Sequence, residues 1–170
     1  MSWREASVGA LLCVAACSGA VINDIGNAVD RGATSVVDSA RSVVAPRTLP
    51  PPKEGEEEPV TRARAAYEDG KVAYQTADYL GAVDKFTESF ATAEEIEDAE
   101  LKAQVQGALY YNLGAAHLYA YDLDKDSAHL TQSKTLLQKY VDAFPDMSAE
   151  DREQASQLMT EADDKLAAHS

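Results

Sequence analysis

The sequence predicts an all-α protein whose folded part begins near residue 60. Ala, Leu, Glu, Gln and Lys, all strong helix formers, dominate from there to the end. Apolar residues recur at steps of three and four, which places them on one face of a helix. Helix breakers beyond Val60 are limited to Gly70, Gly81, Gly107, Gly114 and Pro145. About 110 residues therefore form helices around one modest core.

The charge balance is acidic and restricts the partners that the protein can bind. The 170 residues include 29 Asp and Glu against 15 Lys and Arg, a net charge of −14. Such a surface repels phosphate backbones, so we expect no nucleic-acid partner. Both cysteines, Cys13 and Cys17, precede the predicted domain. The stability of that domain must therefore come from helix packing without a disulfide.

Residues 1–16 have the layout of an export signal. A short charged start with Arg4 leads into the apolar run Ala6–Ala16, which ends in small residues. This run is too short to cross a bilayer, which takes about 20 apolar residues. We therefore assign residues 1–16 as a signal peptide.

The signal ends in Val14-Ala15-Ala16-Cys17, which resembles the lipobox of bacterial lipoproteins. The resemblance implies lipidation of the Cys17 thiol and cleavage just before it, so that two or three acyl chains hold the mature N-terminus in a membrane. Residues 17–45 then form a lipidated tether. Ser18, where some lipoproteins carry a retention aspartate, implies the outer membrane, facing the periplasm. An ordinary secretory signal or a misassigned start codon are the alternatives.

The tether contains a pattern typical of an amphipathic helix, interrupted by Gly26 and Gly32. Its apolar positions are Ile22, Ile25, Val29, Val36, Ala40 and Val43. Three interpretations remain open: a membrane-lying or partner-binding helix, a helix that docks on the folded domain, and a partly disordered tether.

Residues 46–59 form a linker rich in proline and glutamate. Pro50, Pro51 and Pro52 favour an extended polyproline conformation, and the glutamates of 54–58 repel one another. We therefore expect a semi-rigid spacer that separates the domain from the lipid surface.

The predicted domain, residues 60–170, resembles the tetratricopeptide-repeat (TPR) family. The residues that match one repeat starting at Ala63 are Gly70, Ala73, Tyr79, Ala82, Phe86 and Ser89. The resemblance implies stacked antiparallel helical hairpins. The residues themselves support this, because Gly70 and Ala82 are small where two helices would cross closely. Tyr74, Tyr79 and Phe86 are large where the helix pair must be filled.

A second unit repeats the pattern with longer spacing. Its matching residues are Tyr110, Leu113, Gly114 and His117, then Ser133, Leu137, Tyr140 and Pro145. Gly114 follows Gly70 by 44 residues, whereas a TPR unit has about 34. We expect these ten or so extra residues to extend the join between the repeats, and seven further residues to lengthen the loop at 119–126 within the second unit.

A final helix is predicted after Ser148. Its hydroxyl is placed to cap the first turn, and Asp151 follows three residues later. Ala155, Leu158 and Ala162 continue as an apolar stripe. Repeat arrays need a terminal helix to cover the last apolar face, so this segment is predicted to be a C-terminal capping helix.

No residue pattern predicts catalysis, a cofactor or a metal. None of the three histidines has metal-ligand spacing, and we expect His117 in the core or at its boundary. The acids of 122–126 begin like a calcium loop, but Ser133 occupies its twelfth position instead of Glu. The acids of 94–100 are expected to form a solvated face. We therefore expect a protein that is not an enzyme.

The TPR resemblance also implies a binding groove lined by the first helix of each repeat. Its positions here are Arg64, Tyr67, Lys71, Tyr74 and Gln75, then Ala108, Tyr111, Ala115, Leu118 and Tyr119. Aromatic rings with two cations would suit a peptide with apolar and acidic groups. The alternative is that several of these tyrosines pack against the N-terminal or C-terminal helix.

These features together predict a lipid-anchored TPR adaptor or scaffold of the bacterial cell envelope. It would bind an unidentified protein or peptide, and its oligomeric state is left open. One alternative is a subunit of outer-membrane or envelope assembly machinery. A second alternative is an exported enzyme or small-ligand-binding protein, which would show a deep polar pocket with convergent titratable groups.

Overall fold

A computed structural model describes residues 43–169 and confirms an all-helical fold, with no strand among those residues. The five helices are α1 (Glu58–Gln75), α2 (Tyr79–Ala93), α3 (Ala99–Asp124), α4 (Ser127–Ala143) and α5 (Ala149–His169). The predicted signal peptide, Cys17 and the tether before residue 43 lie outside the described residues.

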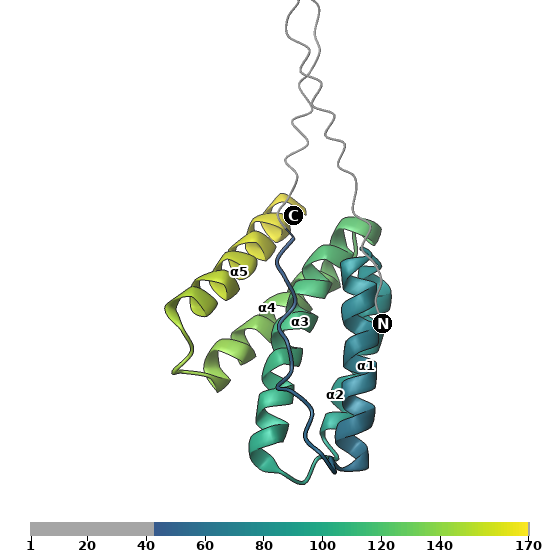
Figure 1. The fold of residues 1–170 in the computed structure, drawn as a ribbon. Helices are drawn as coiled ribbons and strands as arrows, with labels where there is room; N and C mark the ends of the chain where they lie inside the picture. The colour runs from purple at the N-terminus through teal and green to yellow at the C-terminus, as the bar shows by residue number, and fades with distance from the viewer. Residues whose placement is uncertain (1–42, 170) are drawn as a thin grey trace, which may run out of the picture. The chain divides into compact units, whose positions relative to one another are not determined.

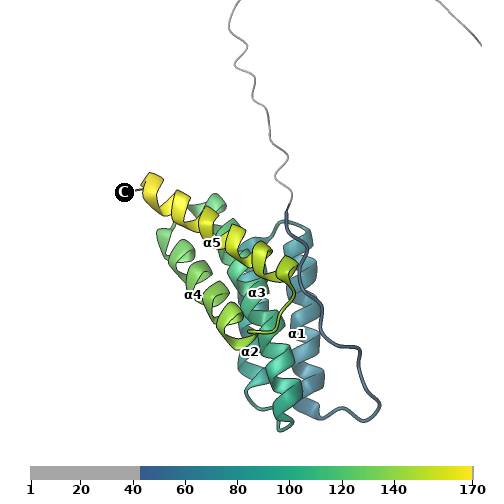
Figure 2. The same cartoon turned by 90° about the vertical axis from the view of Figure 1, so that its left-hand side faces the viewer.

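The helices pack as two antiparallel hairpins and a final helix (Figures 1 and 2). Helix α1 pairs with α2, and α3 pairs with α4. Contacts between α2 and α3 join the two hairpins, and α5 packs mainly on α4. This order agrees with the predicted stack of hairpins and a helix that covers its end.

Small residues sit where the paired helices cross. A Cβ atom at Gly70 would lie 2.6 Å from Cδ1 of the Phe86 ring, and one at Gly114 would lie 2.6 Å from Cγ of Leu137. The first crossing also carries a buried hydrogen bond, in which Ser89 Oγ donates to the carbonyl of Ala63 at 2.7 Å. The predicted close crossing at Gly70 is confirmed.

Side chains cap the starts of the four later helices. Asp78, Asp98 and Asp126 each accept a hydrogen bond from a backbone N–H of the first turn of α2, α3 and α4. Ser148 accepts from the N–H of Asp151 at 3.0 Å, as the sequence predicted. These bonds satisfy donors that have no partner within the helix.

The predicted long loop at 119–126 is wrong, because residues 119–124 continue α3 as helix. The turn is confined to Lys125, which is left-handed with φ 62°, and to Asp126. The added residues have apolar surface to bury. Tyr119 and Tyr121 are buried, and the Tyr121 hydroxyl meets Nδ1 of His169 on α5 at 3.3 Å.

Among residues 43–169, none of the helices has the length and apolar character needed to span a membrane.

Candidate functional site

Residues 43–50, called the strap below, lie extended along the hairpins. Figure 1 shows this segment passing over α3, with α1 on one side and α5 on the other. We call the surface that it contacts on these three helices the groove. The strap has no regular secondary structure of its own, so its backbone groups are available to side chains of the groove.

The backbone of Arg47 is bound by two buried side chains at the centre of the groove. The N–H of Arg47 donates to Oδ1 of Asn112 at 2.7 Å, and Nδ2 of Asn112 returns a bond to the Arg47 carbonyl at 3.3 Å. The Tyr67 hydroxyl donates to the same carbonyl and accepts a bond from Nδ2 of Asn112 at 2.6 Å. The groove therefore binds the strap through backbone N–H and carbonyl groups, as in the recognition of extended peptides.

A pair of tyrosines binds Val44. The Tyr74 hydroxyl of α1 donates to the Val44 carbonyl at 2.9 Å, and the Val44 N–H donates to the Tyr119 hydroxyl of α3 at 3.2 Å. The centroids of the two rings are 5.9 Å apart. The strap is thus held by α1 and α3 at two separate points.

The Arg47 side chain reaches the first turn of α5. Its guanidinium forms an ion pair with Asp151, and Nη2 donates to Oε1 of Gln154 at 3.1 Å. It also lies over the Tyr111 ring, 4.4 Å from the centroid. Nε of Arg47 is buried and has no hydrogen-bond partner. The Arg47 site thus combines a carboxylate, an amide and an aromatic face, which together suit a guanidinium.

Arg64 holds the other end of the strap. Its Nη1 donates to the Pro50 carbonyl at 2.7 Å, while Nε and Nη2 bind the two carboxylate oxygens of Glu56 at 3.2 and 2.7 Å. The connection between the strap and α1 is therefore folded back onto α1, although Pro51, Pro52 and Lys53 remain exposed.

Burial favours the neutral hydroxyl of three groove tyrosines. It raises the pKa of the Tyr67 and Tyr74 hydroxyls far above the ordinary value of 10.0, and that of Tyr111 to about 12. Neutral hydroxyls can donate to backbone carbonyls, whereas phenolates cannot. The groove therefore offers uncharged donors over the whole neutral range.

The structure brings five of the predicted groove residues to the strap. They are Arg64, Tyr67, Tyr74, Tyr111 and Tyr119. Lys71 instead pairs with Glu68, Gln75 is exposed, and Leu118 is fully buried in the core. The predicted semi-rigid spacer at 46–59 differs from the structure in its first part, because residues 46–50 pack in the groove. A composition that disfavours helices leaves backbone groups free for other partners, and the groove supplies them.

The sequence did not place Asn112, Asp151 or Gln154 among the groove residues, and it gave no binding role to Arg47. Asn112 did carry a signal, since it is one amide between the apolar residues Leu109 and Leu113. A polar residue at 0% exposure requires partners. Nothing in the linker's composition indicated that its arginine would be one of them.

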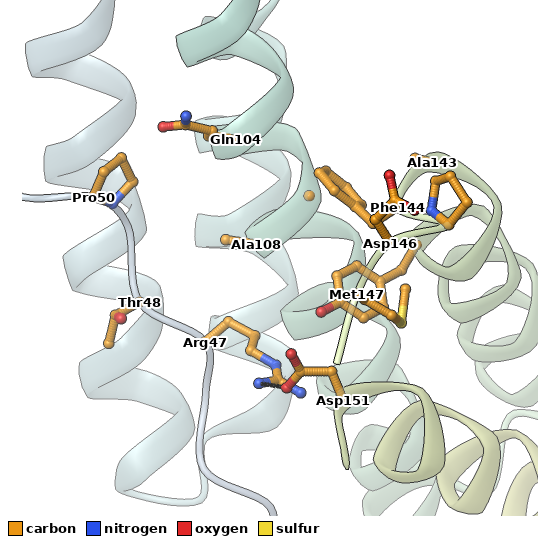
Figure 3. Close-up of a pocket in the computed structure, with 13 residues that line it drawn as sticks. Arg47, Thr48, Pro50, Gln104, Ala108, Ala143, Phe144, Asp146, Met147 and Asp151 are labelled. Carbon is orange, nitrogen blue, oxygen red and sulfur yellow. Dashed lines mark ion pairs between the residues drawn. The ribbon is translucent and has the colours of Figure 1, made fainter. Parts of the chain in front are cut away.

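A pocket of about 570 Å³ opens beside the strap. Arg47 and Pro50 border it on one side, and Phe144 and Met147 of the α4–α5 connection border it on the other (Figure 3). Gly107 of α3 also lines it. The strap therefore leaves apolar surface next to the groove uncovered.

Two histidines form a chain outside the groove. Nδ1 of His117 meets Nδ1 of His129 at 2.8 Å, and Nε2 of His129 meets Oδ2 of Asp124 at 3.1 Å. His117 is half-buried, which agrees with its predicted boundary position. No group of three or more metal-ligating side chains occurs within the described range.

Comparisons with known proteins add no relatives: no protein-family model matches the sequence, and neither a curated protein nor a solved structure shows significant similarity to it.

Proposed function

We propose that this protein is a membrane-tethered TPR-like lipoprotein that acts as a protein-binding adaptor or scaffold in the bacterial cell envelope. The observation that carries the proposal is the groove itself. Tyr67, Tyr74 and Asn112 bind the strap through backbone carbonyl and N–H groups, which every extended peptide possesses. A surface that binds one extended segment in this way has the chemistry to bind another.

Binding fits the described residues better than catalysis does. Tyr67 and Tyr74 of the groove are neutral, and the Asp151 carboxylate is paired with Arg47 of the strap. Catalytic sites instead bring titratable groups to a reacting centre with pKa values tuned near the operating pH. Lipidation at Cys17 would hold the adaptor at the outer membrane, facing the periplasm.

A role in outer-membrane or envelope assembly machinery is a narrower form of the same proposal. A role in small-ligand binding is a second candidate, and the pocket beside Arg47 favours it, because its volume lies in the ligand range of about 300–1,000 Å³. That alternative predicts a small molecule that co-purifies with the full chain and appears by mass spectrometry after denaturation.

Photo-crosslinking in cells tests the adaptor. A crosslinking amino acid is placed at Gln104, which lines the pocket beside the groove, and the matched control is placed at the exposed Thr87 of α2. We expect one defined protein partner to crosslink from position 104 and not from position 87. The same partner at position 87 alone, or none at either position, would contradict binding at the groove.

The lipid anchor is tested separately with Cys17→Ser. We expect the natural chain to incorporate labelled palmitate and to sediment with membranes, and the variant to lose both properties. Mass spectrometry of the mature N-terminus should find an acylated Cys17. An unmodified thiol at that position would rule out the lipoprotein assignment and leave the adaptor proposal intact.

A further inference from the structure

We propose that the groove is an arginine-selective site for an extended segment of a partner protein, and that the strap is a resident competitor which the partner displaces. This inference rests on the adaptor proposal and deepens it, since it states the chemistry of the partner. The groove's central subsite recognises arginine, whereas its remaining polar contacts with the strap are with the backbone.

The strap lies at the edge of the core, with Val44 and Leu49 partly buried against it and other residues open to solvent. Ala45 and Thr48 are exposed, and Val43 retains 46% of its surface. Hydrogen bonds to the backbone of Val44 and Arg47 hold the strap, together with the packing of the Val44 and Leu49 side chains. Arg47 is the strap residue whose side chain forms an ion pair and a hydrogen bond with the helices. Backbone contacts give affinity for any extended chain, so the arginine side chain supplies the polar selectivity.

The subsite around Arg47 is specific for a guanidinium. Asp151 supplies a carboxylate, Gln154 an amide oxygen and Tyr111 an aromatic face. A planar guanidinium uses all three at once, whereas a lysine ammonium is a single point charge. The charge of the whole described domain is also acidic, which favours a cationic segment.

The strap fits this site incompletely. Arg47 leaves its buried Nε without a partner, and the pocket bordered by Phe144 and Met147 stays open beside the strap. A partner segment gains contacts that the strap lacks if it covers that apolar surface, or if its own arginine finds an acceptor for Nε. This gain is needed, because a competitor tethered in the same chain acts at an effective concentration of about millimolar.

Displacement requires no change in the helices. The connection from the strap to α1 includes exposed residues 51–55, among them Gly55 with φ +75° and open space around it. Contacts within the hairpins, such as Ser89 with Ala63, do not involve the strap, and the bond between Asn112 and Tyr67 joins the two hairpins directly. The strap can therefore leave the groove while the hairpins keep their packing.

Fluorescence anisotropy with a labelled synthetic peptide of residues 43–52 tests the proposal. The receptor is the full chain, either natural or with Arg47→Ala, which weakens the resident strap. Apparent affinity rises as the competent fraction rises. We expect the Arg47→Ala chain to bind the peptide about tenfold more tightly than the natural chain does, because its strap has lost an ion pair and a cation–π contact.

Peptide variants and a receptor variant test the selectivity. Peptides with Arg47→Lys or Arg47→Ala should bind the Arg47→Ala chain about tenfold more weakly than the natural peptide, and adding Asp151→Asn to that chain should remove most of the difference. Equal binding of all three peptides would overturn arginine selectivity.

Two results would overturn displacement. One is an Arg47→Ala chain that keeps its helical circular dichroism but binds no peptide. The other is an Arg47→Ala chain that unfolds, since a displaceable segment cannot be required for the fold. If either occurred while crosslinks from position 104 persisted, the adaptor proposal would stand and only its ligand chemistry would fall.

Discussion

Oδ1 of Asn112 accepts a hydrogen bond from the backbone N–H of Arg47 at 2.7 Å, although the two residues are 65 positions apart. Asn112 is fully buried in α3, and its Nδ2 also donates to the Tyr67 hydroxyl on α1. One amide thus connects the strap to both hairpins. A buried amide with these partners gives the strap its register in the groove.

Replacing Asn112 should destabilise the fold and loosen the strap. In Asn112→Leu the Arg47 N–H loses its acceptor, and we expect a loss of about 2–3 kcal/mol in the free energy of unfolding. Urea unfolding measures this loss, and hydrogen exchange at the Arg47 amide should accelerate in parallel. Gln138→Ala, which removes an exposed bond to Asp142, is the control and should change stability by less than about 0.5 kcal/mol. Similar losses for both variants would contradict the role of Asn112.

A methyl group at Gly70 should destabilise the first hairpin. Helix propensity alone would make Gly70→Ala stabilising by about 1 kcal/mol. The new Cβ would however lie 2.6 Å from the fully buried Phe86 ring, and overpacking of this kind costs about 1–3 kcal/mol. We expect a net loss of stability in urea unfolding. Phe86→Leu in the same chain should relieve part of it, so that the two changes are less than additive.

Ala65→Gly is the matched control for this crossing. Ala65 is exposed on the same helix, so its replacement reports propensity without packing, and a loss of about 1 kcal/mol is expected. A Gly70→Ala chain that gained this amount would show that α1 and α2 do not cross as closely as the structure has them.

The helices and their crossing could be predicted because their determinants are local. Gly70 and Phe86 fit the spacing of a helical-hairpin repeat, and the capping pattern at Ser148 predicts the start of α5. The end of α3 was missed, since Asp122, Asp124 and Asp126 resemble a loop in composition. The helix continues to residue 124 because α5 covers Tyr121. Rules based on neighbouring residues cannot predict a contact with a helix that comes later in the chain.

The groove could be predicted only in part. Helical spacing places Tyr67, Tyr74 and Tyr111 on one surface, and the structure brings all three to the strap. The occupant could not be predicted, because an extended segment bound through its backbone leaves no periodic pattern in the sequence. Arg47 of the strap pairs with Asp151, which lies 104 residues later in the chain, so neither residue could be predicted as the partner of the other.

Removing the cap of α5 should weaken the arginine subsite as well as the helix. Ser148→Ala deletes the acceptor for the Asp151 N–H, and we expect a stability loss of about 1 kcal/mol. Because Asp151 lies in the same turn, hydrogen exchange should also accelerate at Val44 and Arg47 of the strap. Ser156→Ala, at an exposed position inside α5, is the control and should leave both quantities unchanged. A loss confined to α5 would show that the turn and the strap are independent.

The pair of His117 and His129 should make stability fall in mild acid. Burial, together with the neighbouring His129, lowers the pKa of His117 from 6.5 to about 4. As the pH falls below 6.5, the unfolded chain therefore takes up a proton before the folded chain does. The stabilisation is complete above pH 6.5 and is lost as the pH approaches about 4. Because His117 is partly exposed, we expect a loss of about 1–2 kcal/mol.

Asp124, which faces His129, acts in a different window. Its pKa lies below 3.8, chiefly through the N–H of Asp126, so its stabilising contribution is lost only in stronger acid. The urea midpoint at pH 7 and at pH 5 therefore isolates His117. His117→Gln should flatten the change between these two values, because no proton is then excluded from that position. His169→Gln, which replaces an exposed imidazole at the end of α5, is the matched control. Midpoints that fall in parallel for the natural chain and His117→Gln would assign the acid sensitivity to another group.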